Sequence, residues 1–156
     1  MAQNELVNTA TDHGCFGCGE QNPIGLHLKF FRREGAVEAR FVPRKTHEGY
    51  VHMMHGGIVS ALLDEAMSWA VIDGGHLAVT AKMQVHFRKP VPVNAPLTVI
   101  GRVDRDRGRA IEASGELLDA DGTLLASSSG VFMRVSEEQQ RQWEATYLGR
   151  DDSAQN

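Results

Sequence analysis

The spacing of apolar and polar residues predicts two strands near the start of the chain. In residues 36–42, apolar side chains alternate with charged ones, which is the period of a half-buried β-strand. Residues 26–33 form another β-like run, and the Glu34-Gly35 pair between the two segments is typical of a turn. Residues 13–25 are rich in glycine and turn formers, so we expect a loop or a short helical turn there.

The middle of the chain predicts one long helix, followed by more strands. Residues 55–75 contain few β-branched side chains, and Gly74-Gly75 is a typical helix stop. The connections between the later extended segments are short and turn-rich, which indicates antiparallel neighbours. These segments are residues 78–90, 96–106, 109–119 and 123–135.

Ser136 and Gln139 resemble a capping box for a short helix over residues 136–148. The order of elements predicts an α+β fold in which a curved antiparallel β-sheet wraps around one long central α-helix, because a single apolar helix must bury itself against the sheet. We expect three parts, which are a flexible tail, one domain, and a short helix with a second tail. They cover residues 1–12, 13–136 and 137–156.

Composition excludes several classes of protein. Of the 156 residues 42% are apolar, and the longest apolar runs fall far short of a membrane span. The net charge is −4 and the basic residues are scattered, so we expect no nucleic-acid partner. The first residues do not have the pattern of a signal peptide, and only two cysteines occur, so we expect a cytoplasmic protein without a disulfide framework.

Asp64 is the most conspicuous residue of the predicted helix, because a carboxylate in so apolar a segment is costly if it is buried without partners. On a helical wheel its neighbours are mostly small, which leaves room for a ligand beside it. These neighbours are Gly57, Ser60, Ala61, Met67, Ser68 and Val71. The opposite face is expected to pack on the sheet through Ile58, Leu62, Ala66 and Trp69.

His55-Gly56-Gly57 opens this helix. Free backbone N–H groups at a helix start favour negative charge, and glycines let a ligand approach the backbone closely. Acyl transfer needs such donors, since the carbonyl oxygen becomes an oxyanion. Asp64 lies about 10 Å along the helix from Gly57. The two groups would meet more readily if a second subunit supplied the carboxylate, so we expect a homodimer or homotetramer.

The segment HEGYVHMMHGGIVSALLDEAMSWA resembles the signature of hotdog-fold thioesterases of the phenylacetate-pathway (PaaI-like) type. In that pattern an acidic residue follows the histidine of His-Gly-Gly by nine positions, as Asp64 follows His55. CFGCGEQNPIGLHLKF, at 15–30, is similar to the first segment in one branch of these proteins. The resemblance spans 13–135 and implies a thioesterase that hydrolyses acyl-CoA to the free acid and coenzyme A.

The resemblance also implies catalytic roles. The Gly57 N–H would polarise the thioester carbonyl, and Asp64 would act as general base or as nucleophile. His55 would hold the loop and the substrate, and Thr80 would help to place the attacking water. Relatives often carry Asn or Gln in the loop before His-Gly-Gly, where this chain has Glu48.

The expected substrate-binding residues surround the same elements. Gly56, Glu48 and Ser68 would contact the acyl-CoA substrate, while Arg88 and Lys89 would meet the phosphates of coenzyme A or form a solvated strand end. We expect no cofactor. Two other functions fit the same fold, namely a non-catalytic acyl-CoA-binding module and a dehydratase or hydratase that uses a loop histidine with the helix acid.

His13, Cys15 and Cys18 form an H-x-C-x-x-C motif. It could supply three zinc ligands, with His47 or His52 as the fourth. The alternative is a tight loop with two partly buried thiols, and we expect no metal because a single CxxC falls short of the usual paired knuckles.

Overall fold

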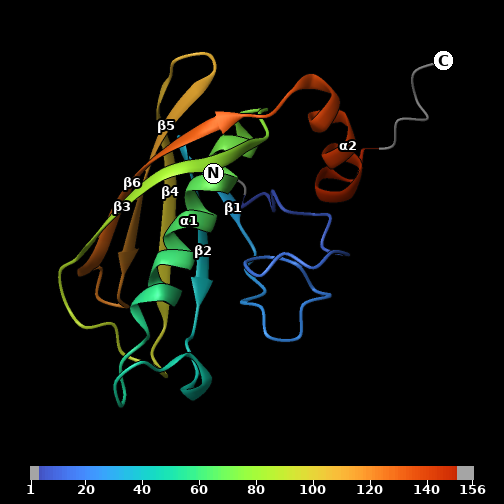
Figure 1. The fold of residues 1–156 in the computed structure, drawn as a ribbon. Coiled ribbons are helices and arrows are strands. Elements are labelled where there is room, and N and C mark those ends of the chain that lie inside the picture. The colour runs from blue at the N-terminus through green and yellow to red at the C-terminus, as the bar shows by residue number, and fades with distance from the viewer. Residues whose placement is uncertain (1–3, 151–156) are drawn as a thin grey trace.

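The computed structural model describes residues 4–150, which form one curved sheet with a long helix against it (Figure 1). The helices are η1 (Lys45–His47, a 3₁₀ turn), α1 (Gly56–Asp73) and α2 (Glu137–Leu148). The strands are β1 (Phe31–Arg33), β2 (Ala36–Phe41), β3 (Ala78–Phe87), β4 (Leu97–Asp106), β5 (Ala110–Leu118) and β6 (Leu124–Arg134).

The sheet has six strands in the order β1-β2-β4-β5-β6-β3, and every neighbouring pair is antiparallel. Strand β3 directly follows α1 in the chain but lies at the edge far from β2, so α1 crosses one face of the sheet to connect them (Figure 1). The predicted α+β fold with a central helix is therefore confirmed. Strands β1 and β3 form the two edges.

Helix α1 begins and ends at the predicted signals. His55 is its N-cap and Gly74 its C-cap, within two residues of the expected bounds. Leu62 and Ala66 are fully buried against the sheet. The approach is closest at Gly101 of β4, where an added Cβ would lie 2.0 Å from the Ala66 carbonyl oxygen. The helix can pack this close to the sheet only because β4 has a glycine at this position.

The first strand is much shorter than predicted. Leu26, Leu28 and Phe30 are buried, but the ladder with β2 begins only at Phe31. The backbone before it bonds instead to the glycine-rich loop, where the Leu28 N–H donates to the Gly17 carbonyl at 2.9 Å. The expected strand is therefore split between a short ladder and a segment bound to this loop.

The segment before the domain docks on this extended stretch. Asn8 is fully buried, donating to the Leu28 carbonyl and accepting from the Phe30 N–H, both at 2.7 Å. Asn8 therefore bonds to the stretch that precedes β1. The expected flexibility of residues 1–12 remains a prediction. Residues 1–3 of that tail lie outside the described residues.

Helix α2 follows the last strand as expected, with Ser136 as its N-cap accepting from the Gln139 N–H. It packs against the N-terminal loop through Tyr147, whose ring meets the His13 ring edge-on at a centroid distance of 4.8 Å. The predicted boundaries of the domain, at residues 13 and 136, remain a prediction.

Candidate active site

The start of α1 is held by the histidine that precedes it. The His55 Nδ1 atom accepts the Gly57 N–H at 2.8 Å, and the backbone N–H of His55 donates to the His47 carbonyl, also at 2.8 Å. His55 therefore ties the helix start to the preceding loop. This contact agrees with the loop-holding part of the role implied for His55.

The free donor at the helix start is not the expected one. Because the Gly57 N–H is already bonded to His55, it is satisfied within the chain. The Gly56 N–H has no acceptor among residues 4–150, and Gly56 is exposed. The resemblance implied that the donor is the Gly57 N–H, whereas the free N–H at the helix start is that of Gly56. The difference arises because a histidine at the N-cap can bond to the second N–H that follows it.

Asp64 lies in the middle of α1 and points to the sheet edge. Its Oδ1 atom accepts a hydrogen bond from the Thr80 hydroxyl at 2.7 Å. Asp64 is half-buried and Thr80, on β3, is exposed. A carboxylate with one fixed hydrogen-bond donor and one side open to solvent can meet both a water molecule and a substrate.

An irregularity in β3 aims Thr80 toward the helix. Met83 and Val85 of this strand pack on the core, so strict alternation would turn Thr80 to the other face. The register with β6 shifts between Thr80 and Lys82, which leaves Ala81 as an extra residue. Such a bulge reverses the alternation and brings the Thr80 hydroxyl to the helix side.

The Gly56 N–H and the Asp64 carboxylate are not brought together in one chain. They lie eight residues apart on the same straight helix, which corresponds to about 12 Å of rise. Strand β3, next to Asp64, is ten residues long and pairs only with β6, so its other edge is open along its whole length within residues 4–150.

The expected substrate-binding residues gather in two places. Arg88 and Lys89 are exposed at the end of β3, and Phe87 brings this end to the helix start, since its ring lies 3.5 Å from a Cβ placed on Gly56. Ser68 is half-buried, one turn after Asp64. Phe87, which is 57% exposed, is a further candidate for the site that the sequence did not reveal.

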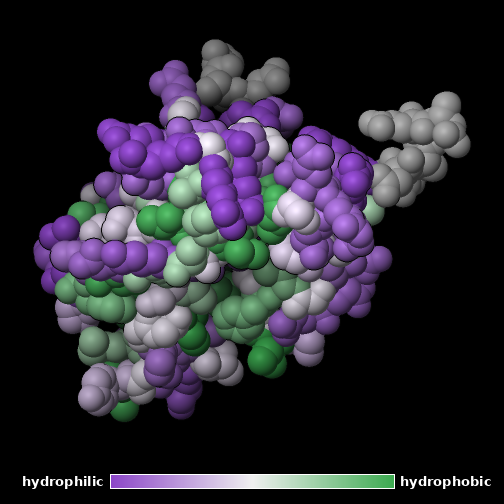
Figure 2. Space-filling view, turned by 45° about the horizontal axis from the view of Figure 1, so that its top comes forward, coloured by the Kyte–Doolittle hydropathy of each residue, from purple (hydrophilic) through white to green (hydrophobic). Residues whose placement is uncertain are grey.

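A small pocket lies beside His55 and Gly56, lined by the loop that precedes them. Its other walls are Gly49, Tyr50, Met53 and Met54. Glu48 lies in the same loop, and its Oε1 atom accepts the His52 N–H at 3.1 Å. Several large apolar side chains are exposed, including Tyr50. Figure 2 shows apolar side chains that reach the surface between polar ones.

The face of α1 around Asp64 is less open than predicted. Met67 and Val71 were expected to line space for a ligand, but both are buried in a cluster with Ile111 and Phe132. The curvature of the sheet explains the difference, because β5 and β6 wrap over this flank of the helix. The room beside Asp64 is therefore confined to the side of Thr80.

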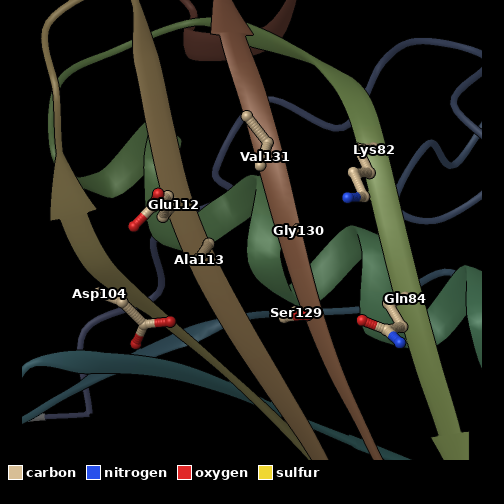
Figure 3. Close-up of a pocket in the computed structure, with 8 residues that line it drawn as sticks. All are labelled: Lys82, Gln84, Asp104, Glu112, Ala113, Ser129, Gly130 and Val131. Atoms are coloured by element: carbon tan, nitrogen blue, oxygen red, sulfur yellow. The ribbon is translucent and has the colours of Figure 1, made fainter.

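Another hollow lies on the outer face of the sheet. Figure 3 shows it with α1 behind the strands, and charged side chains from β3, β4 and β5 surround it. They are Lys82, Asp104 and Glu112. The hollow contains none of the residues that the sequence assigned to the site.

The alternative zinc set, His13 with the two cysteines, is not assembled among residues 4–150. The His13 ring is used within the loop, since Nε2 contacts the Ala10 carbonyl at 2.9 Å and Nδ1 accepts the Cys15 N–H at 3.3 Å. The His47 Nδ1 atom accepts the Arg44 N–H. Burial is the larger cause that lowers the pKa of His47, and the charge of Arg44 lowers it further. Across the part of the chain that the structure describes, one group of three potential metal ligands occurs, and its third member is Glu65 rather than a histidine.

Neither α-helix in residues 4–150 combines the length and the apolar character needed to cross a lipid bilayer.

Comparison with known families finds a match over the middle of the chain. Residues 52–126, which include the helix start, Asp64 and Thr80, match the family model of the thioesterase superfamily. Together with the sheet and its central helix, this match defines a hotdog fold. Over these residues the chain is similar to the thioesterase superfamily.

Two relatives that are named acyl-coenzyme A thioesterases are similar to most of this chain. The acyl-coenzyme A thioesterase THEM4 of Bos taurus is 25% identical over 126 residues, covering 79% of this chain and 52% of that protein. The acyl-coenzyme A thioesterase THEM5 of Mus musculus is 29% identical over 103 residues, covering 65% and 42%. The chain thus spans about half the length of these relatives.

Solved structures share the fold. A thioesterase superfamily protein has a TM-score of 0.73 at 27% identity, covering 76% of this chain and 62% of that one. A Streptococcus mutans protein bound to acetyl-CoA has a TM-score of 0.68 at 16% identity, covering 75% and 95%. The PaaI protein of E. coli, from the phenylacetic acid degradation operon, has a TM-score of 0.66 at 18% identity, covering 71% and 81%.

Proposed function

We propose that this protein hydrolyses acyl-CoA thioesters, with Asp64 as the catalytic carboxylate. The observation that carries the proposal is the hydrogen bond between Asp64 on α1 and Thr80 on β3, together with the free N–H of Gly56 at the start of the same helix. A carboxylate with a fixed hydrogen-bond partner and an unoccupied backbone donor are the two groups that acyl transfer to water requires.

In this mechanism the thioester oxygen accepts the Gly56 N–H, and the positive end of the α1 dipole supports the developing oxyanion. Asp64 either removes a proton from water, which attacks the carbonyl carbon, or attacks that carbon itself. Either attack gives a tetrahedral intermediate, which collapses as the C–S bond breaks and the thiolate of coenzyme A leaves and takes up a proton. In the second route water then hydrolyses the resulting anhydride, which releases the acid and restores the Asp64 carboxylate. Thr80 holds one carboxylate oxygen, so the other faces the reacting atoms.

The substrate class rests on similarity and on charge. THEM4 and THEM5 are named acyl-coenzyme A thioesterases, and the similar Streptococcus mutans structure contains acetyl-CoA. Arg88 and Lys89 stand exposed beside the helix start, where they suit the phosphates of coenzyme A. The dehydratase alternative is disfavoured, because His55 is committed to capping α1.

A panel of acyl-CoAs that differ in chain length and aromaticity, assayed by release of free thiol, tests this function. Turnover of at least one member that depends on Asp64 supports a thioesterase. Tight acyl-CoA binding without thiol release from any member would make the protein a binding module and refute the enzymatic proposal.

Each active site, we further propose, is built by two copies of the chain paired along β3. The open edge of this long strand needs a partner, and pairing two β3 strands would place the Asp64 side of one copy near the helix start of the other. The expected assembly is a homodimer, or a homotetramer formed from two of them, acting in the cytoplasm without nucleic-acid or membrane partners.

Mixing two inactive variants tests the shared site. Asp64→Asn and Gly56→Pro should each be nearly inactive alone, since each spoils every site. In a refolded equimolar mixture, half of the dimers would carry one site with both lesions and one with neither. We expect recovery of about a quarter of wild-type activity, by simple two-fold symmetry. No recovery from a mixture that sedimentation shows to be dimeric would assign both groups to one chain.

Thr80→Val should lower kcat by about 10-fold and change KM little, because it removes one hydrogen bond to a charged group and keeps the β-branched shape. Thr80→Ser restores the hydroxyl and should recover most of the rate. If the valine and serine variants are equally impaired, the hydroxyl does not position Asp64.

A further inference from the structure

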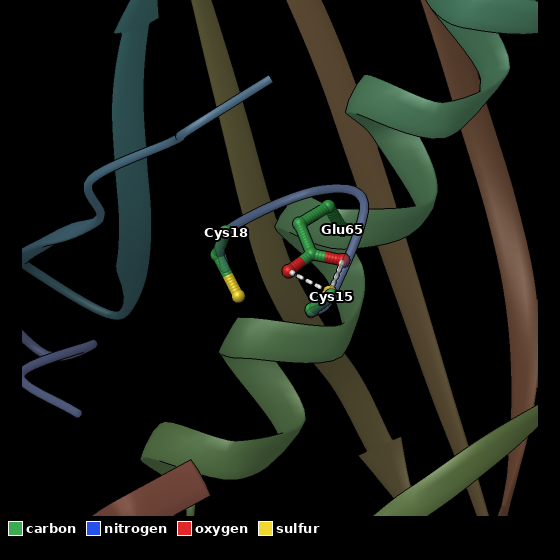
Figure 4. Close-up of side chains that lie close together, drawn as sticks. All are labelled: Cys15, Cys18 and Glu65. Atoms are coloured by element: carbon green, nitrogen blue, oxygen red, sulfur yellow. Dashed lines mark hydrogen bonds between the residues drawn. The ribbon is translucent and has the colours of Figure 1, made fainter. Parts of the chain in front are cut away.

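The two cysteines of the chain meet a carboxylate from the middle of α1. Figure 4 shows Cys15, Cys18 and Glu65 facing one another across the loop and the helix. The Cys15 Sγ lies 3.6 and 3.8 Å from the two Glu65 oxygens, and one ligand atom from each residue lies within 4.8 Å of the others. Glu65 follows Asp64 directly but turns to this loop instead of to β3.

The cluster is held in place from both sides. The Trp69 indole donates to Glu65 Oε1 at 3.1 Å, which fixes the carboxylate one helical turn away. The loop crosses the carboxylate at Gly17, where an added Cβ would lie only 2.3 Å from Glu65 Cδ. Cys18 is buried and Cys15 is half-buried, so the cluster is shielded yet reachable from solvent.

The groups perturb one another. Burial, with the charge of Cys15 next in size, raises the pKa of Glu65 to about 7. A hydrogen bond from the Cys18 thiol, helped by the backbone N–H groups of Cys18 and Gly17, lowers the pKa of Cys15 to about 5. That same contact, together with burial, raises the pKa of Cys18. Three acidic groups thus crowd a site with no cationic side chain bonded to them among residues 4–150.

We propose that Cys15, Cys18 and Glu65 bind a divalent, thiol-preferring cation, with Zn²⁺ the best match. Zinc takes thiolate and carboxylate ligands at about 2.3 and 2.0 Å, so in a tetrahedral site the ligand atoms are roughly 3.5–4 Å apart. The observed separations are close to this geometry, at 3.6 and 3.8 Å from Cys15 Sγ to the Glu65 oxygens and at most 4.8 Å within the group. Three protein ligands leave a fourth position, which a water molecule could fill.

The bound ion would join the N-terminal loop to the middle of α1. Its positive charge would offset the negative charges of the three ligands, because ligands bind a metal in their deprotonated form. Trp69 then serves as the outer partner that orients the Glu65 ligand. This site is separate from Asp64 and does not depend on the thioesterase proposal.

Cobalt titration of the reduced full chain tests the site. The chain has only these two cysteines, so any thiolate-to-cobalt charge-transfer absorption must come from them. We expect one Co²⁺ per chain, with near-ultraviolet charge-transfer bands and the visible absorption of a four-coordinate ion, both lost on addition of Zn²⁺. Absence of the charge-transfer bands would overturn the proposal, including the case in which the cysteines prove to form a reversible disulfide.

Variants then test the individual ligands. Cys15→Ser and Cys18→Ser should each diminish the charge-transfer bands, whereas Glu65→Gln should retain them and weaken the Kd for Zn²⁺ by at least ~10-fold. Glu116→Gln, an exposed carboxylate on β5, is the matched control and should bind as the wild type does. Equal affinity in Glu65→Gln and Glu116→Gln would remove Glu65 from the ligand set.

Discussion

Replacing Asp64 by asparagine is expected to lower kcat by at least ~100-fold, the usual scale for loss of a positioned base. The amide keeps the shape of the side chain and can still accept the Thr80 hydrogen bond, so the fold should be unchanged. Because asparagine can neither deprotonate water nor attack a carbonyl efficiently, the loss is expected for both roles of Asp64. Steady-state kinetics on one good acyl-CoA, with circular dichroism for folding, measures the effect.

Glu65→Gln is the natural comparison, since it removes the adjacent carboxylate from the same helix. Glu65 faces Cys15 and Trp69 instead of Thr80, so this variant should retain most of the turnover. If Asp64→Asn stays near wild type while Glu65→Gln is inactive, the catalytic carboxylate has been misassigned.

The local signals in the sequence were sufficient for most of the fold. Helix α1 could be predicted because its cap at His55 and its stop at Gly74 are encoded within the segment itself. The strands that follow α1 are separated by short turns, so their predicted ends lie near the observed ends. The first strand failed because its partners are distant, namely Asn8 and the loop at Gly17, which take its hydrogen bonds in place of a ladder.

The positions of the candidate site residues could be predicted where they depend on spacing along the chain. The directions in which their side chains point could not. Asp64 was chosen from the helix pattern and Thr80 from the resemblance to hotdog-fold thioesterases, and the two form a hydrogen bond. The bulge at Ala81 that aims Thr80 leaves no mark on the alternation of the sequence. Glu65 could not be linked to Cys15, which lies 50 positions away, because only folding brings the loop over the helix. Local patterns do not encode such pairings.

Gly56→Pro is expected to lower kcat by ~100- to 1,000-fold, the scale for loss of one oxyanion donor. Proline removes the N–H of Gly56 and suits this position, because the first residue of a helix needs no N–H for its own bonds. His55 already has ψ of 134°, within the range that a residue before proline adopts. The substitution therefore deletes the donor with little strain on the helix.

Gly56→Ala separates the donor from the added bulk. A Cβ at Gly56 meets only the Phe87 ring, at the ordinary distance of 3.5 Å, so alanine keeps the N–H without a clash and should stay within about 10-fold of wild-type kcat. Affinity for free coenzyme A, measured by calorimetry, should be similar in both variants because the oxyanion forms only in the transition state. At Gly57 a Cβ would press on the His55 ring at 3.0 Å, so Gly57→Ala should lower Tm through the cap. Turnover that is as high in Gly56→Pro as in Gly56→Ala would show that the first N–H of α1 takes no part in the reaction.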